Sequence, residues 1–386
     1  MQGPEDFGLS AVRTLARVGS VAPAPGHSIF WQHWHAAVDA AGTPRIQART
    51  PAELDPSDPS ADHEFISLGG VRVGCRLDKP AGGRSALRGA VIVLHGSEDV
   101  PTCESDSARW SALRERGLAT LVLRVRGFAG SRTDTGNLLT DVGFAARGLD
   151  AIGVPTAGAG MKPERVMSWT VPQAIADVVL AARALRGALP GGLTLPEGAM
   201  VGLIGESFGG GLAVMASAQL SAAATRTADI DRLAIGLPSL GDWPWRLEHP
   251  VFASPTHAGF AIRSALEAAR GTPRFGELFD AVRLCDAVVH APRVRAWTLC
   301  KLAERDDVVP APAAAAVFNA LGTDPGRKWR FVTPFGHFDG GLRAARRHAL
   351  FDRAAADFFD PAHAPDDTLA RWEGVLSGAN DQPPTT

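Results

Sequence analysis

The sequence contains no tyrosine, although its 386 residues include 17 phenylalanines and 9 tryptophans. Without a phenol group the protein cannot use tyrosine as a proton donor or nucleophile, which excludes reductases built on a Ser/Tyr/Lys set. The sequence also lacks any stretch of 18 or more apolar residues, so we expect no membrane span. Residues 1–25 have mixed charge and no continuous apolar run, which argues against a secretory signal and predicts a cytoplasmic location.

Cysteine is scarce, and neither sign of charge is in clear excess. No CxxC pair is present, so neither a zinc ribbon nor a thioredoxin-type redox motif is supported. We expect reduced thiols at the four cysteines, Cys75, Cys103, Cys285 and Cys300. The 39 basic and 41 acidic residues give a formal charge of −2, which argues against a dedicated nucleic-acid binder. We therefore expect a small-molecule substrate, with no nucleic-acid or membrane partner, no metal and no cofactor.

Apolar segments of strand length alternate with helical patterns through most of the chain. The strand candidates are residues 90–94, 118–125, 200–204, 233–237, 294–300 and 329–332. The helical patterns are residues 105–116, 171–186, 209–220, 311–321 and 341–359. This alternation predicts the α/β class, with a mostly parallel, doubly wound sheet that is covered by helices on both faces.

The two ends of the chain do not follow this alternation. Residues 1–62 are rich in proline, alanine and aspartate, and we expect an N-terminal extension with one short helix around the aromatic cluster at 30–35. The α/β domain is expected over residues 63–360. Residues 361–386 are expected to be a C-terminal tail.

Two local features are expected within the domain. The β-prone runs at 64–68 and 71–75 flank Gly69 and Gly70, which predicts a hairpin with a two-residue glycine turn. The region at about 238–292 is longer than a normal connection. It is therefore expected to be an insertion that shapes a site.

The strongest chemical signal is Gly-Glu-Ser-Phe-Gly at residues 205–209, between an apolar strand and a helical pattern. In this context a G-x-S-x-G sequence forms a sharp turn that exposes the serine hydroxyl, and only small neighbours fit around it. Ser207 is therefore the candidate nucleophile, and the Phe208 amide is a candidate oxyanion donor at the helix N-terminus. The alternative is an ordinary glycine-rich turn between a strand and a helix.

An acid and a histidine follow in the order that such a nucleophile requires. Asp306 lies just after the apolar run at 294–300, and the spacing Asp-x-x-Val-Pro selects it over its neighbour Asp307. His337 follows a glycine in the loop after the last predicted strand. As a general base it would accept the Ser207 proton and return it to the leaving group, while Asp306 fixes its tautomer.

The second oxyanion donor is expected in the loop after the first apolar strand of the core. Within Leu-His-Gly-Ser at 94–97, the amide of Ser97 is the candidate donor. His95 is interpreted as a residue that shapes this loop and not as the base. Trp243 lies in the predicted insertion, where it either lines a substrate pocket or packs the insertion against the core.

These motifs resemble the acetyl xylan esterase and cephalosporin C deacetylase group of α/β-hydrolases, which is carbohydrate esterase family 7. The resemblance runs from about residue 28 to residue 358 and begins with a Phe-Trp pair. The matching segments lie at 126–131, 205–210, 237–242, 306–310 and 336–337. The resemblance implies an α/β-hydrolase fold with Ser207, Asp306 and His337 as the triad. It also implies a homo-oligomer, since this family often forms ring-like hexamers.

The sequence departs from this family at the rim of the site. Phe128 and Phe208 stand where the family has glutamines. Phe338 replaces the glutamate after the base, and Ser97 replaces the usual tyrosine. These changes predict a more apolar rim, with Phe128, Trp243 and Phe338 lining the substrate pocket. Because the tyrosine is missing, stabilisation of the oxyanion must rest on backbone amides.

The sequence therefore predicts an enzyme, a carboxylic ester hydrolase of the acetylesterase or deacetylase type. It would act through a Ser-His-Asp triad and an acyl-enzyme on small acyl esters, above all acetyl esters, and acetates of sugar-like or antibiotic-like alcohols are one candidate class. Two alternatives stay open. One is another α/β-hydrolase reaction on a lactone, a C–C bond or a peptide, and the other is a non-catalytic binding protein on the same scaffold.

Overall fold

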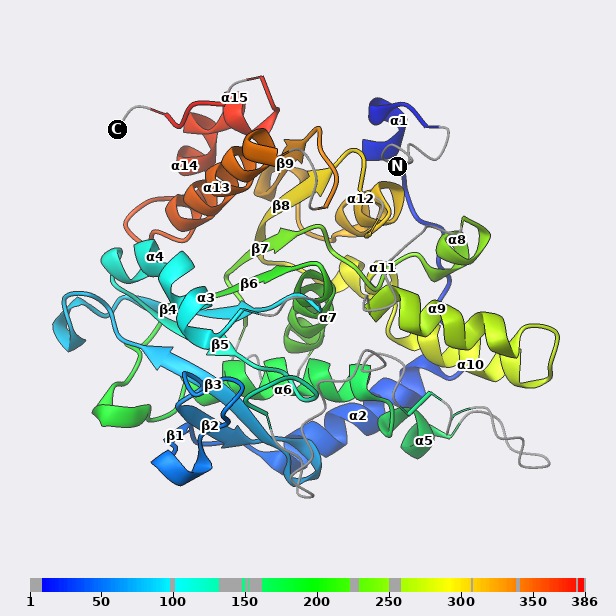
Figure 1. Ribbon diagram of the computed structural model, residues 1–386, viewed down its shortest axis with the longest axis horizontal. Helices are drawn as coiled ribbons and strands as arrows, with labels where there is room; N and C mark the ends of the chain where they lie inside the picture. Colours follow the sequence, from blue (N-terminus) through cyan, green and yellow to red (C-terminus); the bar gives the residue numbers. More distant parts are fainter. Residues whose placement is uncertain are drawn as a thin grey trace.

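The computed structural model describes residues 9–97, 101–131, 148–149, 152, 162–222, 229–249, 258–306, 308–337, 341–379 and 381–384. Within these residues one nine-stranded sheet has the order β1-β2-β3-β5-β4-β6-β7-β8-β9 (Figure 1). The strands are β1 (Gln47–Ala48), β2 (His63–Ile66), β3 (Arg72–Asp78), β4 (Gly89–Leu94), β5 (Leu118–Leu123), β6 (Met200–Glu206), β7 (Arg232–Gly236), β8 (Trp297–Ala303) and β9 (Lys328–Thr333). The pairs β1–β2, β2–β3 and β3–β5 are antiparallel, and the other pairs are parallel.

Helices cover both faces of this sheet (Figure 1). One face carries α2 (His27–Ala41), α6 (Thr170–Leu185), α7 (Phe208–Ala222), α11 (Ala287–His290) and α12 (Ala311–Ala320). The other face carries α3 (Cys103–Arg109), α4 (Ser111–Glu115), α13 (Gly341–Phe358), α14 (Pro365–Arg371) and α15 (Glu373–Leu376). Near the N-terminus and in the long connections lie α1 (Ala11–Leu15), α5 (Pro163–Met167), α8 (Trp243–Glu248), α9 (Ala258–Ala269) and α10 (Arg274–Leu284).

The central strands are apolar on both faces because both faces are buried. In β4, Ala90, Ile92 and Leu94 belong to one hydrophobic cluster, whereas Val91 and Val93 belong to the other. This division follows the two-residue period of side chains along a strand. Near-continuous apolar runs are the expected pattern for parallel strands covered on both sides, so the predicted α/β layering is confirmed.

The N-terminal region contains more structure than the single short helix that the sequence predicts. It holds α1, the 15-residue helix α2 and the strand β1, which pairs with β2. The indole of Trp31 donates a hydrogen bond to the Leu284 carbonyl at 3.2 Å, and that of Trp34 donates to the Pro172 carbonyl at 2.9 Å. These contacts, with segments distant in sequence, fasten α2 to the main body.

The predicted hairpin is present as the antiparallel pair β2–β3, in which Ile66 lies opposite Arg72. Its connection is longer than the expected two-residue turn, because a short 3₁₀ helix, η2 (Leu68–Gly70), lies between the strands. Gly69 and Gly70 have φ values of 71° and 74°, a region that glycine enters without strain.

The C-terminal tail expected over 361–386 contains two short helices in its central part. Residues Pro365–Arg371 and Glu373–Leu376 form α14 and α15. Leu369, Trp372 and Leu376 are buried in the cluster beneath α13. The sequence signal was weak because these apolar residues are few and the helices are short. Their burial depends on the surface that the rest of the fold supplies.

The order in which strands are added changes direction at β4, which pairs in parallel with β5 on one side and with β6 on the other. At such a switch point the loops after adjacent parallel strands diverge, and a crevice opens at the carboxyl ends of the strands. The loops after β4, β6, β7, β8 and β9 all emerge at this edge. This edge receives Ser97, Ser207, Asp306 and His337, which are residues from four separate segments.

Two expectations from composition can be compared with the structure. All four cysteines are free and buried. Among the residues that the structure describes, no helix is both long enough and apolar enough to cross a membrane.

Candidate active site

Ser207 lies at the junction between β6 and α7, in a strained backbone conformation. Its φ of 53° belongs to the left-handed region that residues other than glycine seldom adopt. The turn is held by three backbone hydrogen bonds. The Ser207 amide donates to the Gly236 carbonyl at 2.8 Å, and the Ser207 carbonyl accepts from Gly211 and Ser239 at 3.1 and 3.0 Å. Strain kept in place by such contacts is typical of functional sites.

The glycines around Ser207 are required by close backbone approaches. A Cβ atom at Gly205 would lie 2.3 Å from the Gly209 carbonyl oxygen. A Cβ atom at Gly209 would lie 2.5 Å from the His95 carbonyl oxygen. Both distances are far below a normal contact, so the G-x-S-x-G spacing is explained by the packing of the turn against itself and against the loop after β4.

Asp306 and His337 are brought together by the loops after β8 and β9. Asp306 Oδ2 lies 2.8 Å from His337 Nδ1, and Asp306 Oδ1 accepts hydrogen bonds from the amides of Val308 and Val309 at 2.9 and 2.8 Å. The carboxylate has no exposed surface. It is therefore fixed on both oxygens, and it orients the imidazole so that Nδ1 carries the proton of the neutral ring. Asp307 lies outside the described residues.

The environment of His337 favours its charged form. Burial by itself would lower the pKa of this histidine, but the nearby Asp306 carboxylate outweighs burial, and the pKa of His337 lies above its ordinary value of 6.5. Lys301 opposes this effect, and Glu206 reinforces it. A base that is stabilised on protonation suits a reaction in which an imidazolium forms transiently.

The loop after β4 passes directly beside the strained serine. A Cβ atom at Gly96 would lie 3.9 Å from Ser207 Cβ, and the next residue, Ser97, is partly buried. His95 Nδ1 donates to the Gly96 carbonyl at 2.6 Å, which ties the ring to its own loop. Burial lowers the pKa of His95 to about 3, so it stays neutral. These contacts agree with a loop-shaping role for His95.

Two of the predicted aromatic residues lie together near this loop. The Phe128 ring is 4.4 Å from the His95 ring and 6.0 Å from the Phe208 ring, measured between centroids. Phe128 is partly exposed, whereas the Phe208 side chain is fully buried in the main core. The Phe208 ring therefore supports the rim from beneath and forms no part of its surface, which corrects the expectation that all the phenylalanine replacements act at the rim.

Trp243 lies in the predicted insertion, at the start of α8. Its side chain is 1% exposed and belongs to the main core cluster, with the Arg246 guanidinium 5.4 Å from its ring centre. The backbone before it is held by Asp286, whose carboxylate accepts from the Asp242 and Trp243 amides, both at 2.9 Å. This burial favours the packing interpretation of Trp243 over the pocket-lining one. Phe338, the third predicted pocket residue, lies outside the described residues.

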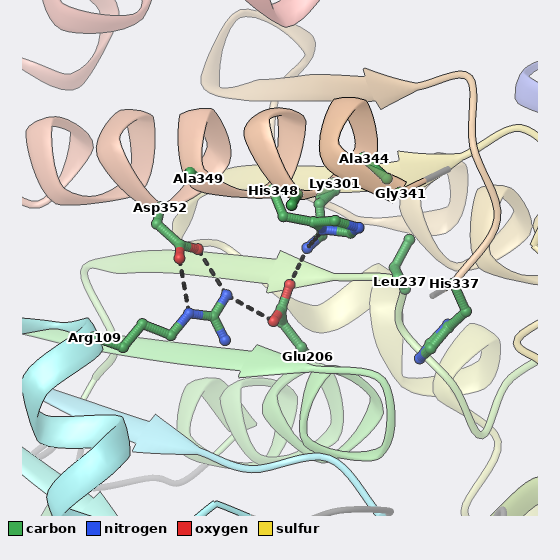
Figure 2. A pocket seen from close by; sticks show the side chains of 11 residues that line it. Arg109, Glu206, Leu237, Lys301, His337, Gly341, Ala344, His348, Ala349 and Asp352 are labelled. Atoms are coloured by element: carbon green, nitrogen blue, oxygen red, sulfur yellow. Dashed lines mark hydrogen bonds and ion pairs between the residues drawn. The ribbon is translucent and has the colours of Figure 1, made fainter. Parts of the chain in front are cut away.

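A charged cluster beside His337 was missed by the sequence analysis. It lines a cavity of about 520 Å³ that His337 also lines (Figure 2). Glu206 accepts from Lys301 Nζ and, at 2.8 Å, from Arg109 Nη2. The sequence offered one signal for this cluster, a lysine directly after the apolar run at 294–300. Lys301 is 1% exposed in the structure, and a buried ammonium needs an anionic partner.

Neither the cluster nor the rest of the described chain suggests a metal centre. No group of three or more histidine, cysteine or acidic side chains is arranged to hold a metal ion in the part of the chain that the structure describes. The Asp306–His337 pair and the Glu206–Lys301 pair are each satisfied by hydrogen bonds within the protein.

Comparisons with known proteins identify the architecture. No protein-family model and no curated protein matches the sequence. Among solved structures, acetyl xylan esterase 1 from Thermoanaerobacterium sp. JW/SL YS485 is similar with a TM-score of 0.63 and 19% identity, over 89% of this chain and 98% of that chain. An acetyl xylan esterase from Paenibacillus sp. R4 is similar with a TM-score of 0.60 and 16% identity, over 89% and 99%. At these identities the likeness concerns the fold, and the predicted α/β-hydrolase fold is confirmed.

Proposed function

We propose that this α/β-hydrolase is a serine esterase of the acetyl xylan esterase and cephalosporin C deacetylase group, acting through Ser207, His337 and Asp306. The observation that carries the proposal is the hydrogen bond between His337 and the buried Asp306 carboxylate, at the sheet edge that also holds the strained Ser207. A buried acid that holds one imidazole nitrogen fixes the ring orientation and tautomer that a general base for a serine hydroxyl needs.

In the first half of the proposed reaction, His337 Nε2 removes the Ser207 proton as Oγ attacks the ester carbonyl. The carbonyl oxygen becomes an oxyanion, for which the amides of Phe208 and Ser97 are the proposed donors. The Phe208 amide belongs to the first residue of α7, at the helix end whose dipole favours negative charge. The resulting imidazolium then protonates the leaving alcohol, and an acyl-enzyme remains on Ser207.

In the second half, water replaces the alcohol. His337 accepts a proton from water, which attacks the acyl carbonyl, and the imidazolium returns the proton to Ser207 Oγ as the acid leaves. Because every step uses only these side chains, amides and water, the proposal needs no cofactor.

Short acyl groups, above all acetyl, are the proposed substrates. The two similar structures are both acetyl xylan esterases, and the partly exposed Phe128 ring places an apolar, inflexible side chain beside the loop of Ser97. Rates on a series of chromogenic esters should therefore fall as the acyl chain lengthens. Faster hydrolysis of lactones, C–C substrates or peptides than of acetates would favour another α/β-hydrolase reaction.

The test of the proposed function is hydrolysis of a chromogenic acetate by the full chain and by Ser207→Ala. Loss of the nucleophile is expected to lower kcat by several orders of magnitude. Labelling with a fluorophosphonate probe provides a second readout, with an adduct expected on the wild type and absent from Ser207→Ala. Undiminished hydrolysis by Ser207→Ala, or a wild type that neither hydrolyses acetates nor reacts with the probe, contradicts the proposal.

A further inference from the structure

Glu206, the residue immediately before Ser207, has a carboxylate between two cations. Arg109 Nη2 donates to it at 2.8 Å, and Lys301 Nζ donates to its other oxygen (Figure 2). The cations hold the pKa of Glu206 well below its ordinary value against the opposing effect of burial. Glu206 is therefore a fixed negative charge at neutral pH.

The Glu206 side chain packs against the neighbouring strand β7 at Gly236, which has no side chain of its own. A Cβ atom at Gly236, at the end of β7, would lie 2.7 Å from both Cγ and Oε1 of Glu206. The Gly236 carbonyl also accepts the hydrogen bond of the Ser207 amide. Gly236 therefore contacts both the nucleophile turn and the Glu206 side chain. A fixed negative charge therefore lies next to the nucleophile turn.

Lys301 also fixes the tautomer of His348. Its ammonium lies 2.8 Å from His348 Nδ1, and because an ammonium only donates, Nδ1 must accept and the proton must be on Nε2. Burial and the Lys301 charge lower the pKa of His348 to about 4. His348 is therefore neutral, and the cluster carries no second switchable charge at the pH of the reaction.

His337 and Glu206 line the same cavity, on opposite sides of the Leu237 side chain (Figure 2). We propose that Glu206 is a positioning residue whose fixed carboxylate, held by Lys301 and Arg109, stabilises the imidazolium that His337 becomes during catalysis. The inference rests on the proposed function, in which that imidazolium forms twice. An opposite charge near an imidazole favours its protonated form, and a low-polarity surrounding strengthens the effect.

Other charged groups near His337 act in both directions. From the β8–α12 loop, the Asp306 carboxylate contacts Nδ1 directly and is the strongest attractive charge. From β8, Lys301 repels the imidazolium. From α13, His348 is neutral, and Asp352 is paired with Arg109 of α3 at 2.7 Å. Removing the Glu206 charge would leave Lys301 without its anionic partner, whereas Arg109 keeps Asp352. The imidazolium would then lose an attraction and meet a stronger repulsion from Lys301.

The test measures kcat/KM against pH with a chromogenic acetate for the full chain and for Glu206→Gln, Glu206→Asp and Lys301→Met. In Glu206→Gln the acidic limb of the kcat/KM profile should move to lower pH, because the imidazolium loses an attraction, and the plateau kcat should fall. In Lys301→Met this limb should move to higher pH, because the imidazolium loses a repulsion. Glu206→Asp keeps the charge and should restore the wild-type limb. A purely structural defect would not move the limb in opposite directions for two members of one ion pair.

Glu64→Gln is the matched control. Glu64 is a buried carboxylate at the far end of the sheet, in β2, and it is likewise held between two cations, Arg49 and Arg72. This variant removes the same charge at a comparable cost to stability, and its acidic limb should coincide with that of the wild type. The inference is overturned if the acidic limb of Glu206→Gln lies at the same pH as the limbs of the wild type and of Glu64→Gln.

A second readout does not depend on turnover. The proton on His337 Nδ1, which is hydrogen-bonded to Asp306, should give a downfield NMR signal that titrates with the imidazole. Its titration should move to lower pH in Glu206→Gln and stay unchanged in Glu64→Gln. If the wild type hydrolyses no acetate, the proposed esterase function fails, whereas this titration still decides the inference: a shift supports it, and identical curves overturn it.

Discussion

At the scale of single residues, the site depends on a few side chains whose orientation is fixed by hydrogen bonds. Asp306 has no exposed surface and uses both oxygens, one for His337 and the other for the Val308 and Val309 amides. An amide in its place would offer a donor where the imidazole Nδ1–H also needs an acceptor. The imidazole would then turn or change tautomer, and its available nitrogen would carry a proton.

Asp306→Asn is therefore expected to lower kcat on a chromogenic acetate by about three to four orders of magnitude, because the base is held in the wrong tautomer. Asp307→Asn is the control, since the spacing Asp-x-x-Val-Pro assigns no triad role to that neighbour. Steady-state kinetics on both variants check the prediction. A large loss in Asp307→Asn with retained activity in Asp306→Asn would reverse the assignment of the acid.

At the scale of elements, the turn between β6 and α7 is specified by backbone contacts as much as by its sequence. Gly209 lies in the first turn of α7, where its Cα packs against the loop after β4. A methyl group there would meet the His95 carbonyl oxygen at 2.5 Å and Leu94 Cβ at 3.0 Å. Because two backbone segments meet at this point, neither can yield without moving Ser207 or the loop of Ser97.

Gly209→Ala should lower the free energy of unfolding by about 1–3 kcal/mol through overpacking, and it should lower kcat by displacing the proposed oxyanion donors. Gly276→Ala in α10 is the matched control, because its Cβ would meet nothing within 4 Å. In that exposed helical position alanine should stabilise by about 0.5–1 kcal/mol. Urea unfolding and kcat for both variants give the comparison. Equal effects of the two substitutions would contradict the packing argument.

At the scale of the whole molecule, the fold buries several histidines in neutral form. Burial is the main cause that lowers the pKa of each, to about 4 for His27 and His348 and to about 3 for His95 and His290. In the unfolded chain the same groups titrate near 6.5. Below that pH the unfolded state binds more protons than the folded state, so their stabilising effect is complete above about pH 6.5 and is lost as the pH falls.

The free energy of unfolding should therefore decrease from pH 7.5 to pH 5, by up to about 1.4 kcal/mol per pH unit for each such histidine. Asp286, whose pKa burial raises to about 6, and His337 oppose this trend but are outnumbered. Urea midpoints across this pH range provide the measurement. His290→Gln should flatten the dependence, whereas His363→Gln, with a side chain 55% exposed, should leave it unchanged. A flat profile for the wild type would refute the prediction.

The sequence by itself determined the alternation of strands and helices in the central part of the chain and the residue types of the candidate triad. Apolar runs such as 90–94 are local, and the G-x-S-x-G turn at Ser207 is a five-residue pattern with its own steric reason. The tertiary structure decided what depends on distant segments meeting. It decided that α14 and α15 are ordered, because Trp372 finds a surface prepared by other elements. It also brought Glu206, Lys301 and Arg109 into one cluster, because parallel strands and a helix from far apart in the chain converge on one cavity.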